Sequence, residues 1–465
     1  MPTVAFYTLG CKVNAYETEA IWHMFEKAGY ERVDFEREAD VYVINTCTVT
    51  HTGDKKSRQI IRRAIRNNPE AIVAVTGCYA QTSPADILNI PGVDIVVGTQ
   101  GRDRLLDYVE TVQRTRQPIN AVTNIMKTRT YEPLEIAKYT ERTRAFLKIQ
   151  EGCNNFCTFC IIPWAKGLSR SRRPEDVLKE AQRLAENGYK EIVLTGIHTG
   201  GYGEDLEDYS LAHLLRDLSR VEGLERIRIS SIEASQITED VLEAFASTDK
   251  LCRHFHVPLQ AGSDPVLKRM RRKYTTAEFA RNIERVRHIF PDAAITTDLI
   301  VGFPGETEEM FLEGYRFVEA LGFSELHVFP YSKRTGTPAA RYTDQVDEGV
   351  KRGRVLQMLG LNEQLKRRYR ERFLNAVLTV IPEGGHDGQD EAIGVDLMPD
   401  HVLLTGLTDN YLRVQFPGKL AWVGQLLPVR LETLTHDGFL GTPVGAPVET
   451  VRIGVVPKDA KEVVL

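Results

Sequence analysis

Short runs rich in valine and isoleucine alternate with amphipathic stretches over the first hundred residues. Buried strands are predicted at Thr3–Leu9, Val41–Thr46, Ile72–Thr76 and Val93–Val97. Helix-period apolar positions recur between them, at Tyr16–Ala28 and Asp54–Asn67. Alternation of strand and helix is typical of a parallel sheet covered by helices. Residues 1–113 are therefore predicted to form an open parallel α/β sheet domain.

A second alternating series follows a polar segment, residues 114–144, which is predicted to be a linker or a docking strap. Its strand candidates are Phe146–Gln150, Glu191–Thr195, Arg226–Ser230, His254–Leu259, Ile295–Val301 and Glu325–Phe329. Long helical stretches separate them, and one basic helix is expected at Val346–Arg372. Six βα units predict a partial (β/α)6 barrel over residues 145–372, with reactive groups at the C-terminal ends of its strands.

The last part of the chain has a β pattern. Short runs at Ala376–Ile381, Val402–Thr408, Tyr411–Phe416 and Leu426–Leu434 are separated by Gly, Pro, Asp and Asn. They predict a small all-β, OB-like barrel over residues 373–442, with a tail at 443–465. The fold class is thus α/β multidomain.

Composition narrows the setting in which the protein works. The chain is 42% hydrophobic and 26% charged, with a net charge of −5, as in a soluble globular protein. No run is apolar and long enough to span a bilayer, and the N-terminus lacks the basic region of a signal peptide. We therefore expect a cytoplasmic protein with no membrane partner. Its seven cysteines are expected to be metal ligands, catalytic groups or core residues rather than disulfides.

Three of these cysteines, Cys153, Cys157 and Cys160, have C-x3-C-x2-C spacing directly after a predicted strand. Three thiolates on one short loop can face one centre, but they leave one iron of a four-iron cluster without a protein ligand. An open position distinguishes catalytic metal sites from closed structural ones. The alternatives are three core cysteines or a zinc knuckle, for which the next residues, 161–164, offer no fourth ligand. The spacing resembles the signature of the radical S-adenosylmethionine superfamily.

The other triplet is spread along the N-terminal domain. Cys11, Cys47 and Cys78 each come just after a predicted strand. Ligands of open parallel sheets bind outside the carboxyl ends of the strands, so these distant cysteines can converge there. The alternative is three unrelated buried thiols, which would more often fall within the apolar runs.

The residues around both triplets resemble one family in particular. Leu9-Gly10-Cys11-Lys12-Val13-Asn14, Asn45-Thr46-Cys47-Thr48-Val49-Thr50, Thr76-Gly77-Cys78-Tyr79-Ala80-Gln81 and the segment Gly152–Pro163 look like radical S-adenosylmethionine methylthiotransferases. The resemblance covers nearly the whole chain, because the C-terminal β segment is placed like the family's TRAM domain.

The resemblance implies two [4Fe-4S] clusters, one held by Cys153, Cys157 and Cys160 and an auxiliary one held by Cys11, Cys47 and Cys78. S-adenosylmethionine would serve as radical source and as methyl donor, and the auxiliary cluster would supply sulfur. The implied cofactor-binding positions are Gly196, Gly200, Gly201, Ser230, Glu233, Gly302 and Gly305. The electron donor would be a low-potential protein such as flavodoxin or ferredoxin.

Three substrate branches of the family are relevant. Two act on the adenosine next to the tRNA anticodon, which carries an isopentenyl or a threonylcarbamoyl group, and one acts on an aspartate of a ribosomal protein. Gly10–Asn14 and Ile162–Gly167 resemble the threonylcarbamoyl branch, whereas the isopentenyl branch tends to show Gln-Met after the first cysteine. A non-enzyme alternative is an RNA-binding iron–sulfur sensor, which would need no cofactor barrel.

Basic patches favour an RNA partner, because phosphate neutralisation supplies most non-specific affinity. They comprise Lys55, Lys56, Arg58, Arg62, Arg63 and Arg66; Lys166, Arg170, Arg172 and Arg173; and the run Lys268–Lys273. A single-stranded anticodon loop lets a base be splayed into a pocket. The alternative for each patch is a solvated helix face. From Glu383 onward acidic residues outnumber basic ones by twelve to six, and residues 384–399 are expected to form a long acidic loop. The C-terminal barrel is therefore expected to contact RNA only through a restricted face formed by Tyr411, Arg413 and Phe416.

Five further residues have side chains suited to metal, cofactor or substrate contacts. Cys252 precedes a strand and is predicted to be a core thiol. His254 and His256 share one face of the fourth strand, and satisfied barrel histidines are favoured over cofactor contacts. The roles of Arg334 and Thr335, after the sixth strand, stay open.

Overall fold

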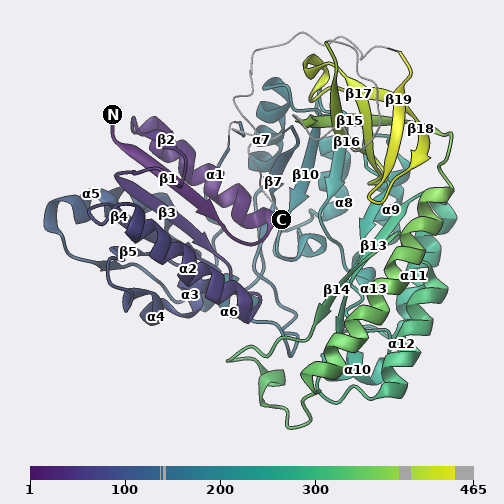
Figure 1. Cartoon of the computed structure of the whole chain (residues 1–465), viewed down its shortest axis with the longest axis horizontal. Coiled ribbons are helices and arrows are strands. Elements are labelled where there is room, and N and C mark those ends of the chain that lie inside the picture. Colours follow the sequence, from purple (N-terminus) through teal and green to yellow (C-terminus); the bar gives the residue numbers. More distant parts are fainter. Residues whose placement is uncertain (137, 140–142, 387–399, 446–465) are drawn as a thin grey trace.

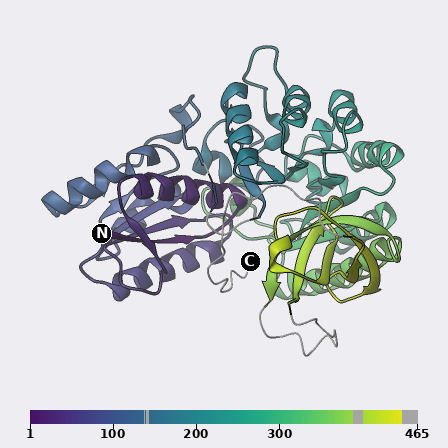
Figure 2. The same cartoon turned by 90° about the horizontal axis from the view of Figure 1, so that it is seen from above.

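The computed structural model describes residues 1–136, 138–139, 143–386 and 400–445 of the chain. It places a parallel α/β sheet domain, a partial barrel and a small β-barrel around a common centre (Figures 1 and 2). Most of the acidic loop expected at 384–399, and most of the expected tail, lie outside the described residues.

The N-terminal domain is built on a six-stranded parallel sheet. Its order is β2 (Glu31–Val33), β1 (Thr3–Thr8), β3 (Val41–Thr46), β4 (Ile72–Gly77), β5 (Ile95–Val96) and β6 (Ile119–Asn120). The helices are α1 (Lys12–Lys27), α2 (His51–Asn67), α3 (Cys78–Thr82), α4 (Pro84–Leu88) and α5 (Leu105–Thr115). β3 and β4 are buried along their whole length, as expected of Val/Ile runs in a sheet covered on both faces. Because β6 pairs with β5, the domain extends past the boundary predicted at residue 113.

The central domain contains six parallel strands in sequence order. They are β7 (Ala145–Lys148), β10 (Glu191–Thr195), β11 (Arg226–Ile229), β12 (His254–His256), β13 (Ala294–Val301) and β14 (Glu325–Pro330), with a parallel bridge between Ile227 and Leu251 joining the two halves. The helices are α6 (Ile162–Lys166), α7 (Pro174–Glu186), α8 (Leu211–Ser219), α9 (Glu239–Ala246), α10 (Asp264–Arg269), α11 (Thr276–Ile289), α12 (Glu308–Leu321) and α13 (Glu348–Glu371). A short antiparallel pair, β8 (Gln150–Glu151) and β9 (Arg170–Ser171), frames the cysteine loop. The predicted partial barrel is confirmed.

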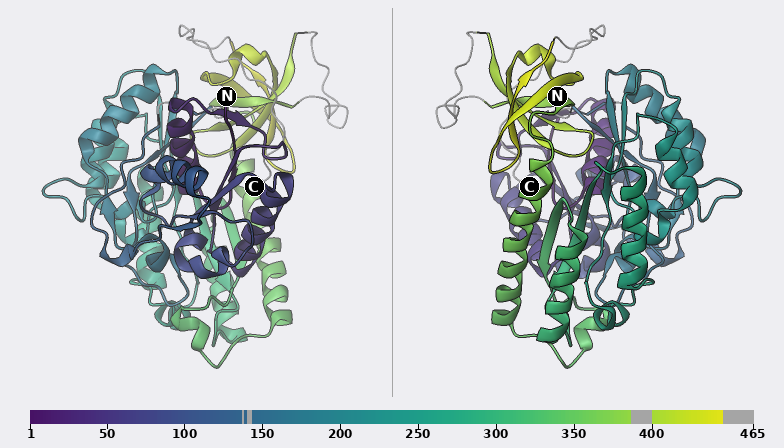
Figure 3. Two further views of the ribbon diagram at one scale, coloured as in Figure 1. Left: turned by 90° about the vertical axis from the view of Figure 1, so that its left-hand side faces the viewer. Right: turned by 90° about the vertical axis from the view of Figure 1, so that its right-hand side faces the viewer.

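The C-terminal domain is a closed five-stranded barrel. Its strands are β15 (Val377–His386), β16 (Val402–Thr408), β17 (Arg413–Gly418), β18 (Leu427–Leu434) and β19 (Phe439–Pro443), in the order β15-β16-β17-β19-β18. The predicted OB-like barrel is confirmed, with β19 as a fifth strand that the pattern did not indicate. The barrel stands at the C-terminal end of α13, which is the predicted long basic helix (Figure 3).

Helix α1 belongs to two cores at once. Ile21 and Phe25 pack with one face of the N-terminal sheet, whereas Tyr16 and Ala20 join the large core of the central domain. The same helix also contacts β7. The sheet domain and the partial barrel are therefore docked through α1, whose first turn follows Cys11 directly.

Candidate active site with two cysteine triplets

Cys11, Cys47 and Cys78 lie at one edge of the N-terminal sheet, as predicted. Each follows the carboxyl end of a strand, β1, β3 or β4, and these three strands are adjacent. Asn14 ties the first two loops together, because its Nδ2 donates to the carbonyls of Leu9, at 2.7 Å, and Thr46, at 3.2 Å. At Gly10, where φ is +106°, a Cβ would lie 3.1 Å from Cys47 Sγ, so this position requires glycine.

The ionisation of these thiols indicates what the site holds. Burial raises the pKa of Cys78 to about 12; Lys166 opposes the rise, and Cys47 and Cys11 add to it. Burial also raises the pKa of Cys47, with Cys11 again contributing. The three thiols are thus within electrostatic reach of one another, and burial favours the protonated form of Cys47 and Cys78. A bound metal takes thiolates and reverses this balance, so the donor set fits an iron–sulfur cluster with three protein ligands.

Cys153, Cys157 and Cys160 lie on the loop between β8 and α6. Gly152 has φ of +70°, and a Cβ there would meet the carbonyl oxygen of Leu168 at 1.9 Å, so only glycine allows this loop to leave the strand. Burial raises the pKa of Cys153 to about 11 and that of Cys160 to about 12, and neighbouring cysteines of the loop add to both. This triplet fits a second cluster by the same reasoning.

Arg272 contacts the loop that carries Cys153, Cys157 and Cys160. Its Nη1 lies 3.3 Å from Cys157 Sγ, and its Nη2 lies 3.0 Å from Glu233, which also accepts from Asn155 at 3.2 Å. The side chain of Arg272 is only 5% exposed. The prediction that the whole basic run Lys268–Lys273 faces RNA is therefore wrong at Arg272, which turns inward to the thiol. Nothing in the sequence separates it from its exposed neighbours.

The two triplets meet at one interface. Helix α3, which begins at Cys78, packs against α6, which follows Cys160 directly, as Figure 1 shows near the centre of the molecule. Thr99 reinforces the contact by donating to the carbonyl of Ala165 at 2.6 Å. The element that begins at Cys78 and the element that follows the Cys153–Cys160 loop are thus in contact where the sheet domain meets the partial barrel.

A buried charge network holds that interface together. Glu17 of α1 forms ion pairs with Arg102 at 2.5 Å, Lys166 at 2.8 Å and Lys148 at 3.4 Å. Glu151 pairs with Lys148 at 2.5 Å and with Arg170 at 3.0 Å, and Glu132, in the expected strap, pairs with Arg102. All these side chains are at most 3% exposed.

The network corrects one part of the RNA prediction. Lys166 and Arg170 belong to it, and Arg172 is equally buried beside Glu180, at 2.7 Å. These cations therefore neutralise internal carboxylates rather than phosphates. On α2, in contrast, Lys55, Lys56, Arg62 and Arg66 are exposed beside the Cys47 loop.

The predicted cofactor positions have definite surroundings. Gly196 lies against Gln150, Gly200 against Gln236 and Gly201 against His198, where a Cβ would lie between 2.1 and 3.1 Å from the neighbouring side chain. Ser230 Oγ is 3.4 Å from Thr199 Oγ1. Gly302 faces Lys351, and Gly305 faces Asp344 and Arg269, on the side of α13. Their contacts with S-adenosylmethionine remain a prediction.

The lumen of the partial barrel is polar. The side chains of His254 and His256 both reach Thr296 Oγ1, at 3.2 and 2.8 Å, and His256 Nε2 lies 3.3 Å from Asp298. Nδ1 of His254 is buried without a hydrogen-bond partner in the described structure, so this histidine is not fully satisfied. Lys12 enters the same region: burial lowers its pKa to about 8, and Arg144 and Arg228 add to the effect.

Arg334, whose role the sequence left open, joins the central domain to the N-terminal domain. Its guanidinium donates to Asp54 at 2.7 Å and to Thr48 Oγ1 at 2.6 Å, which anchors the Cys47 loop to the central domain. Cys252 is 1% exposed, consistent with the expected core thiol.

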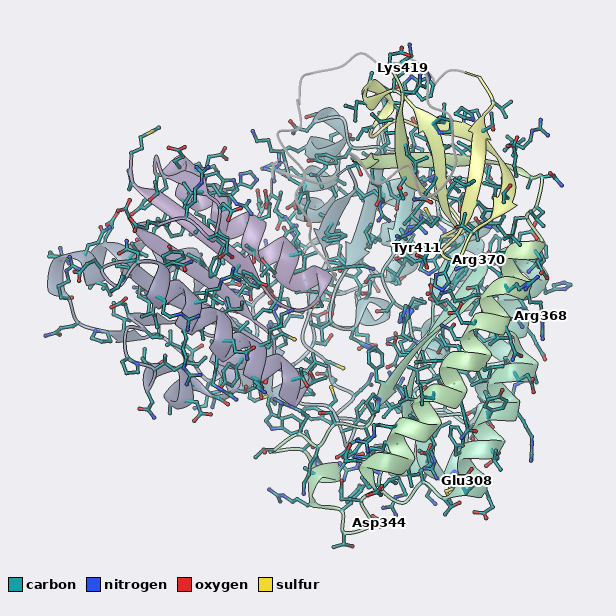
Figure 4. The ribbon with its side chains drawn as sticks, viewed as in Figure 1. Glu308, Asp344, Arg368, Arg370, Tyr411 and Lys419 are labelled. Atoms are coloured by element: carbon teal, nitrogen blue, oxygen red, sulfur yellow. The ribbon has the colours of Figure 1, made fainter. Side chains whose placement is uncertain are left out.

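The predicted RNA face of the C-terminal barrel is wrong at two of its three residues. Phe416 is fully buried in the barrel core, because strand alternation turns it inward with Val414. Tyr411 stacks on His254 with ring centroids 4.2 Å apart, which docks the barrel on the central domain. Figure 4 shows Tyr411 and Arg370 side by side at this junction. Arg413 alone is exposed.

Comparison with known proteins agrees with this architecture. A family model described as "Radical SAM superfamily" matches residues 147–318, and one described as "Uncharacterized protein family UPF0004" matches residues 3–98. Among solved structures, the radical S-adenosylmethionine methyltransferase TsrM from Kitasatospora setae, with cobalamin and a [4Fe-4S] cluster bound, has a TM-score of 0.55 at 17% identity, covering 73% of this chain and 77% of its own. Together with the cysteine loop, the fold defines a radical S-adenosylmethionine protein.

Curated relatives narrow the class. The threonylcarbamoyladenosine tRNA methylthiotransferase MtaB of Bacillus subtilis is 61% identical over 93% of this chain and 94% of its own length. MtaB of Aquifex aeolicus is 42% identical over 79% of this chain and 90% of its own, and a tRNA-2-methylthio-N(6)-dimethylallyladenosine synthase of Natranaerobius thermophilus is 33% identical over 92% and 94%. The chain belongs to the radical S-adenosylmethionine methylthiotransferase family. It is an enzyme whose cofactors are S-adenosylmethionine and [4Fe-4S] clusters. No helix in the described residues has the length and apolarity to cross a membrane.

Proposed function

We propose that this enzyme methylthiolates C2 of N6-threonylcarbamoyladenosine next to the anticodon of tRNA, giving 2-methylthio-N6-threonylcarbamoyladenosine. The observation that carries the proposal is the packing of α3, which begins at Cys78, against α6, which follows the loop of Cys153, Cys157 and Cys160. A site that removes hydrogen and inserts sulfur needs both sets of ligands around one substrate space. The 61% identity to an enzyme named for this substrate supports the choice of branch.

The chain's own residues divide the work between the two triplets. Cys153, Cys157 and Cys160 would hold the cluster at which S-adenosylmethionine binds, and Cys11, Cys47 and Cys78 the auxiliary cluster. When bound, these groups supply radical formation, sulfur and a methyl group, which protein side chains cannot provide. Arg272, Glu233 and Asn155 fix the first loop, and Asn14 and Arg334 fix the loops of the second.

The partners follow from the exposed charges. The exposed cations of α2 would neutralise phosphates of the anticodon loop, and a single-stranded base would be splayed into the polar lumen. Reduction would come from a low-potential protein such as flavodoxin or ferredoxin, which places the enzyme in the cytoplasm.

Nucleoside mass spectrometry tests the proposal directly. Methylthio-threonylcarbamoyladenosine should disappear from the tRNA of cells lacking the gene and return on complementation. If only methylthio-isopentenyladenosine responds, the substrate is wrong and the reaction class stands. If neither nucleoside responds, a ribosomal protein becomes the substrate to test.

Two variants separate the clusters in vitro. Cys157→Ala should abolish cleavage of S-adenosylmethionine together with product, whereas Cys47→Ala should retain some cleavage without sulfur insertion. Full product from Cys47→Ala would contradict the assignment of the auxiliary cluster. Wild-type protein that is reduced and still cleaves no S-adenosylmethionine would instead indicate an RNA-binding sensor.

A further inference from the structure

Three side chains that could bind a metal ion meet in the lumen of the partial barrel. His256 lies on β12, Asp298 on β13 and His327 on β14, and one nitrogen or oxygen atom from each lies within 4.8 Å of the other two. Asp298 and His327 are partners in the parallel pairing of β13 with β14, so their side chains leave the sheet on the same face. The next residue of β13, Leu299, and the preceding residue of β14, Leu326, are buried in the hydrophobic core. The polar group therefore occupies the opposite, lumen-facing side.

The geometry within the group is close to that of a coordination site. His256 Nε2 lies 3.3 Å from a carboxylate oxygen of Asp298, and the ring centroids of His256 and His327 are 5.5 Å apart. Two ligands bound at about 2.0–2.1 Å to one tetrahedral zinc ion lie roughly 3.4 Å apart, so the first pair is already at that separation. A rotation of the His327 side chain would bring the third donor to the same centre.

Thr296 orients His256 for this role. Its hydroxyl oxygen lies 2.8 Å from His256 Nδ1 and 3.2 Å from His254 Nε2. Because the hydroxyl has one hydrogen, it can accept from His256 Nδ1 while it donates to His254. Nε2 of His256 then directs a lone pair toward Asp298, and a cation between these two electron-rich atoms stabilises the arrangement. A hydrogen bond at the second ring nitrogen is the usual support of a metal-bound histidine.

We propose that His256, Asp298 and His327 form a binding site for a divalent transition-metal ion. Two imidazoles and one carboxylate favour ions such as Zn²⁺ or Fe²⁺, whereas Mg²⁺ and Ca²⁺ prefer oxygen ligands. Three protein ligands leave a coordination position for water or for a substrate atom, as in catalytic rather than structural sites. The site contains no cysteine, and the inference does not depend on the substrate proposed above.

The test measures zinc binding by anaerobic enzyme that carries its iron–sulfur clusters. The protein is dialysed against a series of Zn²⁺ concentrations, and zinc and iron per chain are determined in the same sample by elemental mass spectrometry. Wild-type enzyme should bind zinc without losing iron. Loss of a supporting hydrogen bond typically weakens a metal site by about ten- to hundredfold, so Thr296→Val should fall in that range. Asp298→Asn and His327→Gln, which each replace a ligand, should weaken binding at least as much.

His436→Gln is the matched control. His436 pairs with Asp437 at 2.9 Å on the protein surface, and within the described part of the chain no third metal-binding side chain joins this pair. The control variant should therefore bind zinc as wild type does. Absence of zinc binding, or equal binding by wild type and Asp298→Asn, would overturn the inference.

Anomalous diffraction locates the ion independently of any variant. Crystals of the cluster-loaded wild-type enzyme are soaked in Zn²⁺ and measured at the zinc absorption edge. Zinc should lie between His256, Asp298 and His327. Zinc found only at the cysteines or on the surface would overturn the inference, even if a variant had lost its clusters together with its zinc.

Discussion

Replacing Glu17 with glutamine tests how the sheet domain is held to the partial barrel. The carboxylate is fully buried and faces Arg102, Lys166 and Lys148, at 2.5, 2.8 and 3.4 Å. Burial alone would raise the pKa of Glu17, but these three cations hold that pKa well below its usual range. An amide of the same shape removes the charge and leaves the cations short of a counterion.

The size of the effect follows from that imbalance. Breaking a buried ion pair by neutralising one partner costs about 3–5 kcal/mol, because a charge is left buried without compensation. We therefore expect the free energy of unfolding to fall by about that amount. Urea titration followed by tryptophan fluorescence is suited to the measurement, since Trp22 lies on α1 and Trp164 on α6. Glu26→Gln is the control: its exposed carboxylate pairs only with His23 in the described structure, and the expected loss is below about 1 kcal/mol.

The loss of stability in Glu17→Gln should depend on pH in a definite direction. A carboxylate whose pKa is lower in the folded protein stabilises it fully above the unfolded value, about 4.3, and loses this contribution as pH falls toward the folded value. The difference between wild type and Glu17→Gln should therefore be full at neutral pH and shrink below about pH 4. A neutral-pH difference under about 1 kcal/mol, or one that grows on acidification, would refute the reasoning.

Three further substitutions have separate readouts. Gly10→Ala forces a Cβ to 3.1 Å from Cys47 Sγ, so a colorimetric assay should find roughly half the iron per chain, while cleavage of S-adenosylmethionine persists. Full iron loading of this variant would contradict the role of the glycine. Arg272→Met removes the donor 3.3 Å from Cys157 Sγ and should make the midpoint potential of the cluster proposed there more negative in an EPR-monitored redox titration, because a hydrogen-bond donor stabilises the added negative charge of a reduced cluster; an unchanged potential would count against this contact. Tyr411→Ala removes the ring stacked on His254, so it should lower the free energy of unfolding by about 1–2 kcal/mol and speed proteolysis at the barrel junction. Arg413→Ala, at an exposed position, should change neither quantity.

The sequence pattern predicted the strands that coincide with apolar runs and missed several short ones. β3 and β4 are continuous apolar runs, so their position was evident. β2 and β6 are edge strands of three and two residues with little burial, and no apolar run marks them. β19 is likewise short and interrupted by glycine. The small strands that close each sheet therefore became visible only in three dimensions.

The placement of Cys11, Cys47 and Cys78 at one edge of the sheet was predictable because topology alone brings the ends of parallel strands together. The charged residues were not, because the same side chain serves a surface or a core according to its distant partner. Lys166 meets Glu17, 149 positions away, and Arg334 meets Asp54, 280 positions away. No local pattern distinguishes such residues from the exposed cations of α2, so four buried cations (Lys166, Arg170, Arg172 and Arg272) were predicted to face RNA.

The start of α1 also ties the proposed metal site to the contact between the two domains. Cys11 is the N-cap of α1, and the same helix packs into the cores of both the sheet domain and the partial barrel. A rigid helix passes a shift at its first turn along its whole length, so the auxiliary cluster and the domain interface share one mechanical element.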